Sequence, residues 1–133
     1  MPAARNLLKM EVANEWLRKH KPMEYSIEKH ADVQLITLSG RLIEKSQADD
    51  LIRNFEKLIE GDTNRYLMSL EGLEYVNSTG LNLLIGMFTS ARNAGGELVI
   101  GGISPKVKKL MIMTKLDSIF KIYDSVAEAT ENF

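Results

Sequence analysis

The chain has 133 residues, a formal net charge of −1 and no cysteine, which favours one soluble domain and excludes disulfide and thiol chemistry. Its 17 basic residues are scattered along the sequence, so strong nucleic-acid binding is not expected. No apolar run approaches the roughly 20 residues that span a bilayer, and the N-terminus lacks the apolar stretch of a secretory signal, so we expect a cytoplasmic protein without an integral membrane segment.

The first predicted element is an amphipathic helix over residues 7–20, in which Leu8, Val12 and Trp16 recur at helical spacing. Lys21 and Pro22 end it, because the residue before a proline avoids the α region. This helix precedes a regular pattern, so we assign residues 1–22 to an N-terminal helical arm and residues 23–133 to one domain. The arm packs on the domain, covers the open edge of its sheet or mediates a homodimer, and the sequence leaves these alternatives open.

From Met23 onward, predicted strands alternate with predicted helices. A hairpin over residues 23–38 is followed by a helix that starts at Ser46, with Asp49 in the capping box, and stops at Gly61. Next come a strand over 65–70, a turn over 71–77, a helix over 79–94, a strand over 98–100, a helix opened by Ser104-Pro105, a strand over 119–123, and a helix from Ser125 to about Asn132. This order predicts an α/β fold with a mostly parallel sheet of four to five strands and about four helices.

The most informative stretch is Asn77-Ser78-Thr79-Gly80-Leu81, because it connects a buried strand to a helix. Helix N-termini carry unpaired N–H groups and the positive end of the helix dipole, so a phosphate on either hydroxyl would be stabilised there. The alternative is a helix cap without any modification, which stabilises a helix by about 1 kcal/mol. The stretch therefore predicts either a phosphorylation switch or a structural cap.

The predicted helix over 79–94 offers a candidate binding surface beside this turn. Leu81, Leu84, Ile85 and Phe88 are predicted to face the core, whereas Asn82 and Gly86 are among the residues predicted to face outward. Leu83 and Met87 lie between the two sets, so they are either shoulder residues of the core or a partly exposed docking patch.

Catalytic and metal-binding chemistry is not indicated. His20 and His30 lack further ligands at metal-site spacing, and the loop carboxylates Glu71 and Glu74 have no nucleophile and base near them in sequence. No glycine-rich nucleotide motif is present. We therefore expect neither an enzyme nor a metal or cofactor. The lysines at 106, 108, 109 and 115 form a basic cluster, which is either a solvated face or a weak site for an acidic partner.

Taken together, the region from about Met23 to Asn132 resembles a STAS domain of the anti-sigma factor antagonist type. The turn over 77–81 carries the resemblance, and the matching segments elsewhere are Leu38-Ser39-Gly40, Asn93-Ala94-Gly95-Gly96-Glu97-Leu98, Ile103-Ser104-Pro105-Lys106-Val107 and Phe120-Lys121-Ile122-Tyr123-Asp124. They occur in the family's order over most of the chain, which makes the set specific.

The resemblance implies partner switching. In this family the antagonist binds an anti-sigma factor that is also a serine kinase, phosphorylation releases the partner, and a serine phosphatase resets the cycle. By position, Ser78 is the implied phosphoacceptor, Thr79 the secondary one and Asn77 the helix cap. The residues that would bind the partner are Gly80, Asn82, Leu83, Gly86 and Met87.

Two positions depart from the family pattern and make the turn less negative. Asn77 and Ile43 stand where the family carries aspartates. Alternative functions are therefore a STAS scaffold or stressosome-like assembly component that is not phosphorylated, and a STAS module that binds a lipid or another small molecule.

Overall fold

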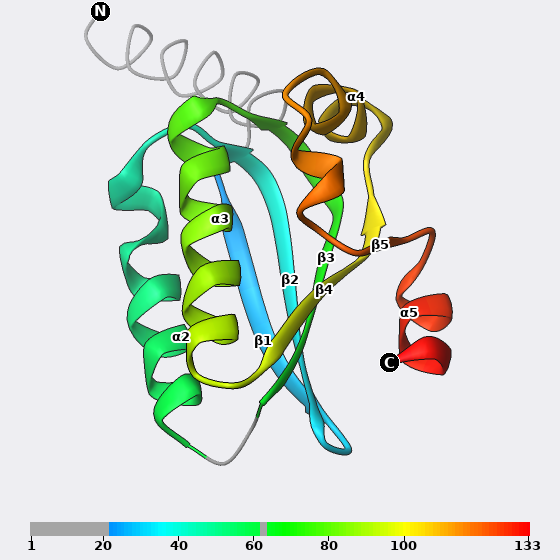
Figure 1. Cartoon of the computed structure of the whole chain (residues 1–133). Coiled ribbons are helices and arrows are strands. Elements are labelled where there is room, and N and C mark those ends of the chain that lie inside the picture. Colours follow the sequence, from blue (N-terminus) through cyan, green and yellow to red (C-terminus); the bar gives the residue numbers. More distant parts are fainter. Residues whose placement is uncertain (1–21, 62–63) are drawn as a thin grey trace, which may run out of the picture.

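The architecture is organised around one five-stranded sheet. The computed structural model describes residues 22–61 and 64–133, and within them the strands lie in chain order across the sheet (Figure 1). The first two strands are antiparallel, and every later strand runs parallel to the strand before it. The strands are β1 (Glu24–His30), β2 (Val33–Leu42), β3 (Arg65–Val76), β4 (Glu97–Ile103) and β5 (Ile122–Tyr123).

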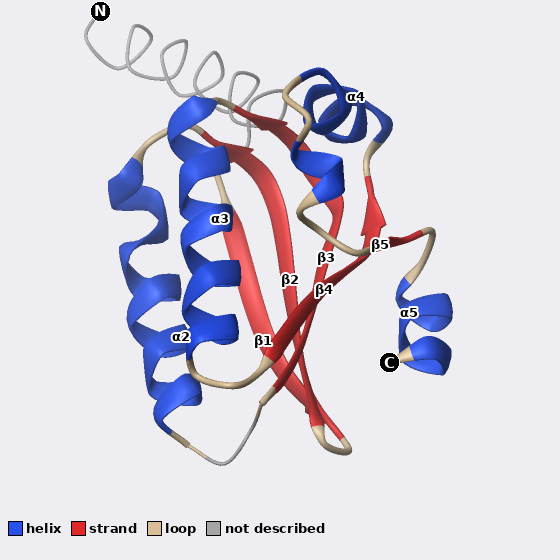
Figure 2. Ribbon diagram, in the orientation of Figure 1, coloured by secondary structure: helices blue, strands red, loops and turns tan. Residues whose placement is uncertain are grey.

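The helices of the described region cover both faces of this sheet. They are α2 (Asp49–Glu60), α3 (Ser78–Asn93), α4 (Pro105–Met113) and α5 (Val126–Asn132). Helices α2 and α3 lie side by side on one face, and α5 lies on the other (Figure 2). The predicted α/β fold with a mostly parallel sheet and about four helices is confirmed, whereas the predicted helix over 7–20 lies outside the described residues.

The main core lies between the sheet and the pair α2 and α3. Leu70 and Val76 of β3 are completely buried there, and Phe55 of α2 packs edge-on against Tyr66 of β3 with 5.0 Å between the ring centroids. Burial of one aliphatic or aromatic side chain stabilises the fold by about 1.5–3 kcal/mol. A smaller cluster on the opposite face packs around Ala129 of α5. The large core therefore fixes α3 against the strand that precedes it.

Several local signals act as the sequence predicted. The hairpin turns at Ala31 and Asp32 between β1 and β2. Pro105 is the first residue of α4, and the Ser125 hydroxyl caps α5 by accepting a hydrogen bond from the Glu128 N–H at 3.0 Å. Short-range capping and turn chemistry thus determines where these elements begin.

The turn predicted over 71–77 is wrong, because β3 continues without a break to Val76. After a register shift, β3 pairs again with β2, and Gly72 lies opposite Ser39. Strand β2 also extends to Leu42, past the end of the predicted hairpin at residue 38, and Gly40 within it adopts a left-handed φ of 85°. The sequence Glu71-Gly72-Leu73-Glu74 is typical of a turn, but here it forms an irregular stretch of β3.

Two other boundaries also differ from the prediction. The capping box at Ser46 is wrong: Glu44 and Gln47 cap a short 3-10 turn that leads into α2, and α2 has no side-chain cap of its own. The last strand is only Ile122–Tyr123, because the chain leaves a second 3-10 turn just before Ile119, and Phe120 is buried in the core.

A polar contact joins α2 to the edge strand β1. The Tyr25 hydroxyl donates a hydrogen bond to the Asp50 carboxylate and accepts one from Asn54 Nδ2 at 2.7 Å. The bond from Tyr25 lowers the pKa of Asp50 below its usual value. Stabilisation from such a carboxylate is present above its ordinary pKa of about 3.9 and is lost as the pH falls through the lowered folded-state pKa.

The Tyr25→Phe variant should therefore melt at a lower temperature than the wild type at pH 7, and this difference should shrink below about pH 4. Asp32, whose pKa is lowered by a hydrogen bond from Arg65, also loses stabilisation in acid, but equally in both proteins. Thermal unfolding followed by circular dichroism at several pH values checks this. A difference that stays constant down to pH 3 would contradict the role assigned to Asp50.

Candidate functional site

The turn between β3 and α3 is held by Asn77. Its side-chain oxygen accepts a hydrogen bond from the Gly80 N–H at 2.9 Å, which caps α3. Its side-chain nitrogen donates to the Ile43 carbonyl at 2.9 Å, which ties the turn to the loop after β2. The predicted cap is confirmed, and the second bond fixes the turn to a neighbouring segment.

Ser78 and Thr79 are the first two residues of α3, and both are exposed. Within residues 22–61 and 64–133, neither hydroxyl takes part in a hydrogen bond. The first turn of α3 contains no acidic residue. Both hydroxyls are thus accessible at the positive end of a helix dipole, where a negative group is stabilised.

Gly80 has a structural role that the sequence interpretation missed. A Cβ atom at this position would lie 2.2 Å from Val76 Cγ2 and 2.6 Å from the Leu42 carbonyl oxygen. Gly80 is buried. The glycine lets α3 approach β2 and β3 closely, and its assignment as a partner-binding residue stays a prediction.

The other four residues predicted to bind a partner lie together. A groove of about 180 Å³ between α2 and α3 is lined by Asn82, Leu83, Gly86 and Met87, with Ile52 and Phe55 of α2 among its other walls. Asn82 and Gly86 are exposed, and Leu83 is half-buried.

Met87 belongs to the core, the first of the two interpretations given above, because only 4% of its surface is accessible. The buried stripe of α3 is formed by Leu81, Leu84, Met87 and Ala91, whereas Ile85 and Phe88 are only half-buried. The helix is therefore rotated relative to the predicted inward face, and Met87 forms the floor of the groove between α2 and α3.

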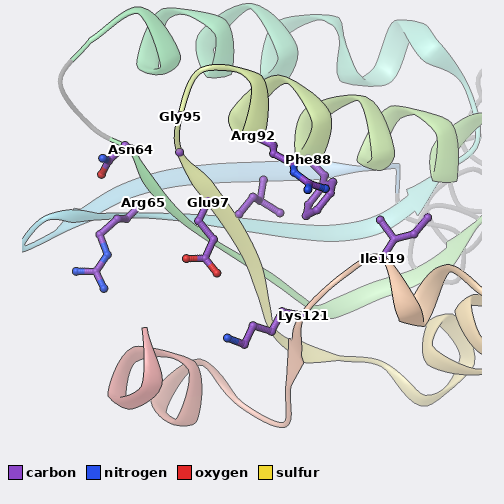
Figure 3. A pocket seen from close by; sticks show the side chains of 10 residues that line it. Asn64, Arg65, Phe88, Arg92, Gly95, Glu97, Ile119 and Lys121 are labelled. Atoms are coloured by element: carbon purple, nitrogen blue, oxygen red, sulfur yellow. The ribbon is translucent and has the colours of Figure 1, made fainter.

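A further pocket lies at the opposite end of α3 from the Asn77–Gly80 turn (Figure 3). It measures about 600 Å³ and combines apolar walls from Phe88 and Ile119 with the charged side chains of Arg65, Glu97 and Lys121. Arg65 is already engaged, since it bonds Asp32 at 2.9 Å and the carbonyl of the last residue. The pocket is separate from the Asn77–Gly80 turn.

The described residues contain no group of three metal-ligating His, Cys, Asp or Glu side chains. His30 lies 3.2 Å from Glu28, and both side chains are exposed. Among the described helices, each is too short or too polar to cross a bilayer.

The STAS domain model matches residues 24–129. The chain belongs to the STAS domain family. The resemblance drawn from the turn over 77–81 and from the order of the elements is thereby confirmed.

Relatives of this STAS protein include named regulators. It is 28% identical over 109 residues to the anti-sigma F factor antagonist of Paenibacillus polymyxa, a match that covers 80% of this chain and 92% of that protein. An anti-sigma-B factor antagonist of Listeria monocytogenes is 34% identical over 65 residues, which is 49% of this chain and 57% of that protein.

Solved STAS structures share the fold. An anti-sigma factor antagonist from Mycobacterium paratuberculosis superposes with a TM-score of 0.68 at 21% identity, over 83% of this chain and 92% of that one. The Bacillus cell fate determinant SpoIIAA in its phosphorylated form gives a TM-score of 0.65 at 18% identity, over 82% of this chain and 98% of that one. At these identities the likeness is one of fold.

Proposed function

We propose that this STAS domain is an anti-sigma factor antagonist, which binds an anti-sigma factor that is also a serine kinase and is released when Ser78 is phosphorylated. The observation that carries the proposal is the exposed Ser78 hydroxyl, which has no hydrogen bond within the described residues and lies at the start of α3. The similarity to the antagonist of Paenibacillus polymyxa supports the class of partner.

A phosphate on Ser78 would be favourable within the domain and unfavourable in a complex. It adds about −1.5 to −2 charges, and the α3 dipole stabilises a negative group at this end by about 0.3–1 kcal/mol. The same charge would have to lose water, or meet like charge, at a closely packed interface, and such mismatches cost several kcal/mol. Modification would therefore leave the fold intact and weaken partner binding.

The partner surface that we propose consists of the turn and the groove between α2 and α3. Asn82, Leu83 and Gly86 form its accessible rim, and Met87 its buried floor. Thr79 is the secondary acceptor, because it is exposed on the same first turn. A serine phosphatase would restore the unmodified form, and we place this cycle in the cytoplasm, with no catalysis or cofactor contributed by the STAS domain.

Two alternatives make different predictions. A scaffold or stressosome-like component would self-assemble and carry no phosphate on Ser78. A STAS module for a lipid or another small molecule would use the pocket of about 600 Å³ near Arg65, which lies away from the turn, so its ligand would bind equally to the wild type and to variants of Ser78.

Incubation with ATP and a serine-kinase anti-sigma factor from the same organism should place phosphate on Ser78, as located by mass spectrometry. Ser78→Asp should weaken binding of the unmodified protein to this partner by at least about tenfold, equivalent to about 1.4 kcal/mol. Ser78→Ala should bind within about 0.5 kcal/mol of the wild type, because it adds no charge at an exposed position.

Matched variants separate the acceptor from the binding surface. Thr79→Ala should still be phosphorylated, whereas Gly86→Arg should block the groove without disturbing the fold, because a Cβ at Gly86 meets no atom within 4 Å. Absence of phosphate from Ser78 and Thr79, combined with stable self-assembly, would overturn the switch and favour the scaffold.

A further inference from the structure

A second groove is lined by residues of α4 and by the end of β3. Helix α4 lies at the end of the sheet where α3 begins (Figure 1). It measures about 140 Å³, and its walls include Tyr75, Leu110 and Met113. The Met113 side chain is 71% exposed, the most of the large hydrophobic side chains in the described region. An exposed apolar side chain at the mouth of an apolar groove indicates a surface that gains stability when it is covered.

The rim of this groove is basic. Lys106 and Lys109 line it one helical turn apart, and neither takes part in a salt bridge within residues 22–61 and 64–133. An occupant that matches the groove therefore presents an apolar side chain together with carboxylates at a similar spacing.

The chain enters the described structure next to this groove. Pro22 forms a β-bridge with Arg41, and the Arg41 guanidinium lies over the Tyr75 ring, 5.1 Å from its centroid. Tyr75 is a wall of the groove. Arg41 thus connects Pro22 to Tyr75, so the segment that precedes Pro22 begins close to the apolar groove.

We propose that residues 1–21 dock on their own domain, with Trp16 in the groove on α4 and with Glu11 and Glu15 facing Lys106 and Lys109. Glu11 and Glu15 lie four residues apart, and so do Val12 and Trp16, so a helical segment places an acidic stripe beside an apolar stripe. Trp16 lies six residues before Pro22, a stretch that spans about 9 Å as a helix and up to about 20 Å when fully extended.

The tether explains why this segment, rather than a separate protein, is the occupant. A short covalent connection gives an effective concentration on the order of millimolar, so even weak contacts suffice to keep the groove covered. The groove also includes Val76, the residue before Asn77. The docked segment would therefore border the turn that carries Ser78. The proposal does not depend on the proposed antagonist function.

Trp16 is the single tryptophan of the chain, so its fluorescence reports docking directly in the full-length protein. In the wild type we expect blue-shifted emission and protection from acrylamide, both independent of protein concentration. The double variant Lys106→Glu, Lys109→Glu should lose this protection and shift the emission to the red. Met113→Asp should have the same effect through the apolar contact.

Controls distinguish docking from unfolding. Lys108→Glu makes the same charge change on an exposed residue of α4 outside the groove lining, and it should leave the emission unchanged. Adding Glu11→Lys and Glu15→Lys to the double variant should restore protection, which a misfolded domain cannot do. Solvent-exposed emission in the wild type, insensitivity to the charge reversals, or protection that appears only at high protein concentration, as in a dimer, would each overturn the proposal.

Discussion

Gly80→Ala should lower the free energy of unfolding by about 2 kcal/mol or more, although alanine is normally the better helix former. The added Cβ would lie 2.2 Å from Val76 Cγ2 and 2.6 Å from the Leu42 carbonyl oxygen. The carbonyl belongs to the backbone of β2 and Val76 is completely buried, so relief requires movement of α3 against the sheet. Overpacking of this kind costs about 1–3 kcal/mol.

Gly86→Ala is the matched control on the same helix. A Cβ there has no neighbour within 4 Å, so alanine should raise the free energy of unfolding by about 0.5–1 kcal/mol through its helix propensity. Urea unfolding of the wild type and both variants should show a lower free energy of unfolding for Gly80→Ala and a higher one for Gly86→Ala. Equal effects at the two glycines would contradict the close approach assigned to Gly80.

Substitution of Asn77 should have the next largest effect on stability. Asn77→Ala removes both the cap on Gly80 and the bond to the Ile43 carbonyl, with an expected loss of about 2 kcal/mol. Asn77→Asp keeps an acceptor for the Gly80 N–H but places a carboxylate oxygen against the Ile43 carbonyl, so one bond is lost and a repulsion is introduced. The gain from a negative charge at the helix start is only about 0.3–1 kcal/mol.

Asn77→Asp should therefore be less stable than the wild type but more stable than Asn77→Ala, as measured by urea unfolding. Asn77→Ser is a useful control, because serine caps helices well but cannot reach across to Ile43 with an amide. If Asn77→Asp proved as stable as the wild type, the hydrogen bond from Asn77 to the Ile43 carbonyl would contribute nothing measurable to the free energy of unfolding.

Asn77 also illustrates how far the sequence determines the site. The cap was predictable, since it depends on residues three positions apart in the chain. The bond to Ile43 joins residues 34 positions apart, and only the packed sheet brings them together. The sequence interpretation treated Asn77 and Ile43 as two separate departures from the family pattern, whereas the fold joins them in one contact.

The features that the sequence left open or missed have a common physical cause. Helix and strand identity followed from periodicity, but β3 continued past Leu70 because pairing with β2 continued through an irregular register. Met87 became buried because α2 and the sheet fix the rotation of α3. The role of Gly80 depends on the Leu42 carbonyl of a distant strand. Each of these features is a tertiary contact, which local patterns do not encode.

The close fit around Gly80, together with the two bonds of Asn77, has a consequence for how a signal can leave this site. The first turn of α3 packs tightly against β2 and β3, which leaves no room for a hinge. A phosphate on Ser78 would therefore cause little movement of the backbone. The phosphorylated and unmodified forms would then share one backbone conformation and differ only in surface charge, so a partner would distinguish them only at the binding interface. Under the proposed function, phosphorylation of Ser78 would therefore change the charge that a partner meets and leave the packing of the domain as it is.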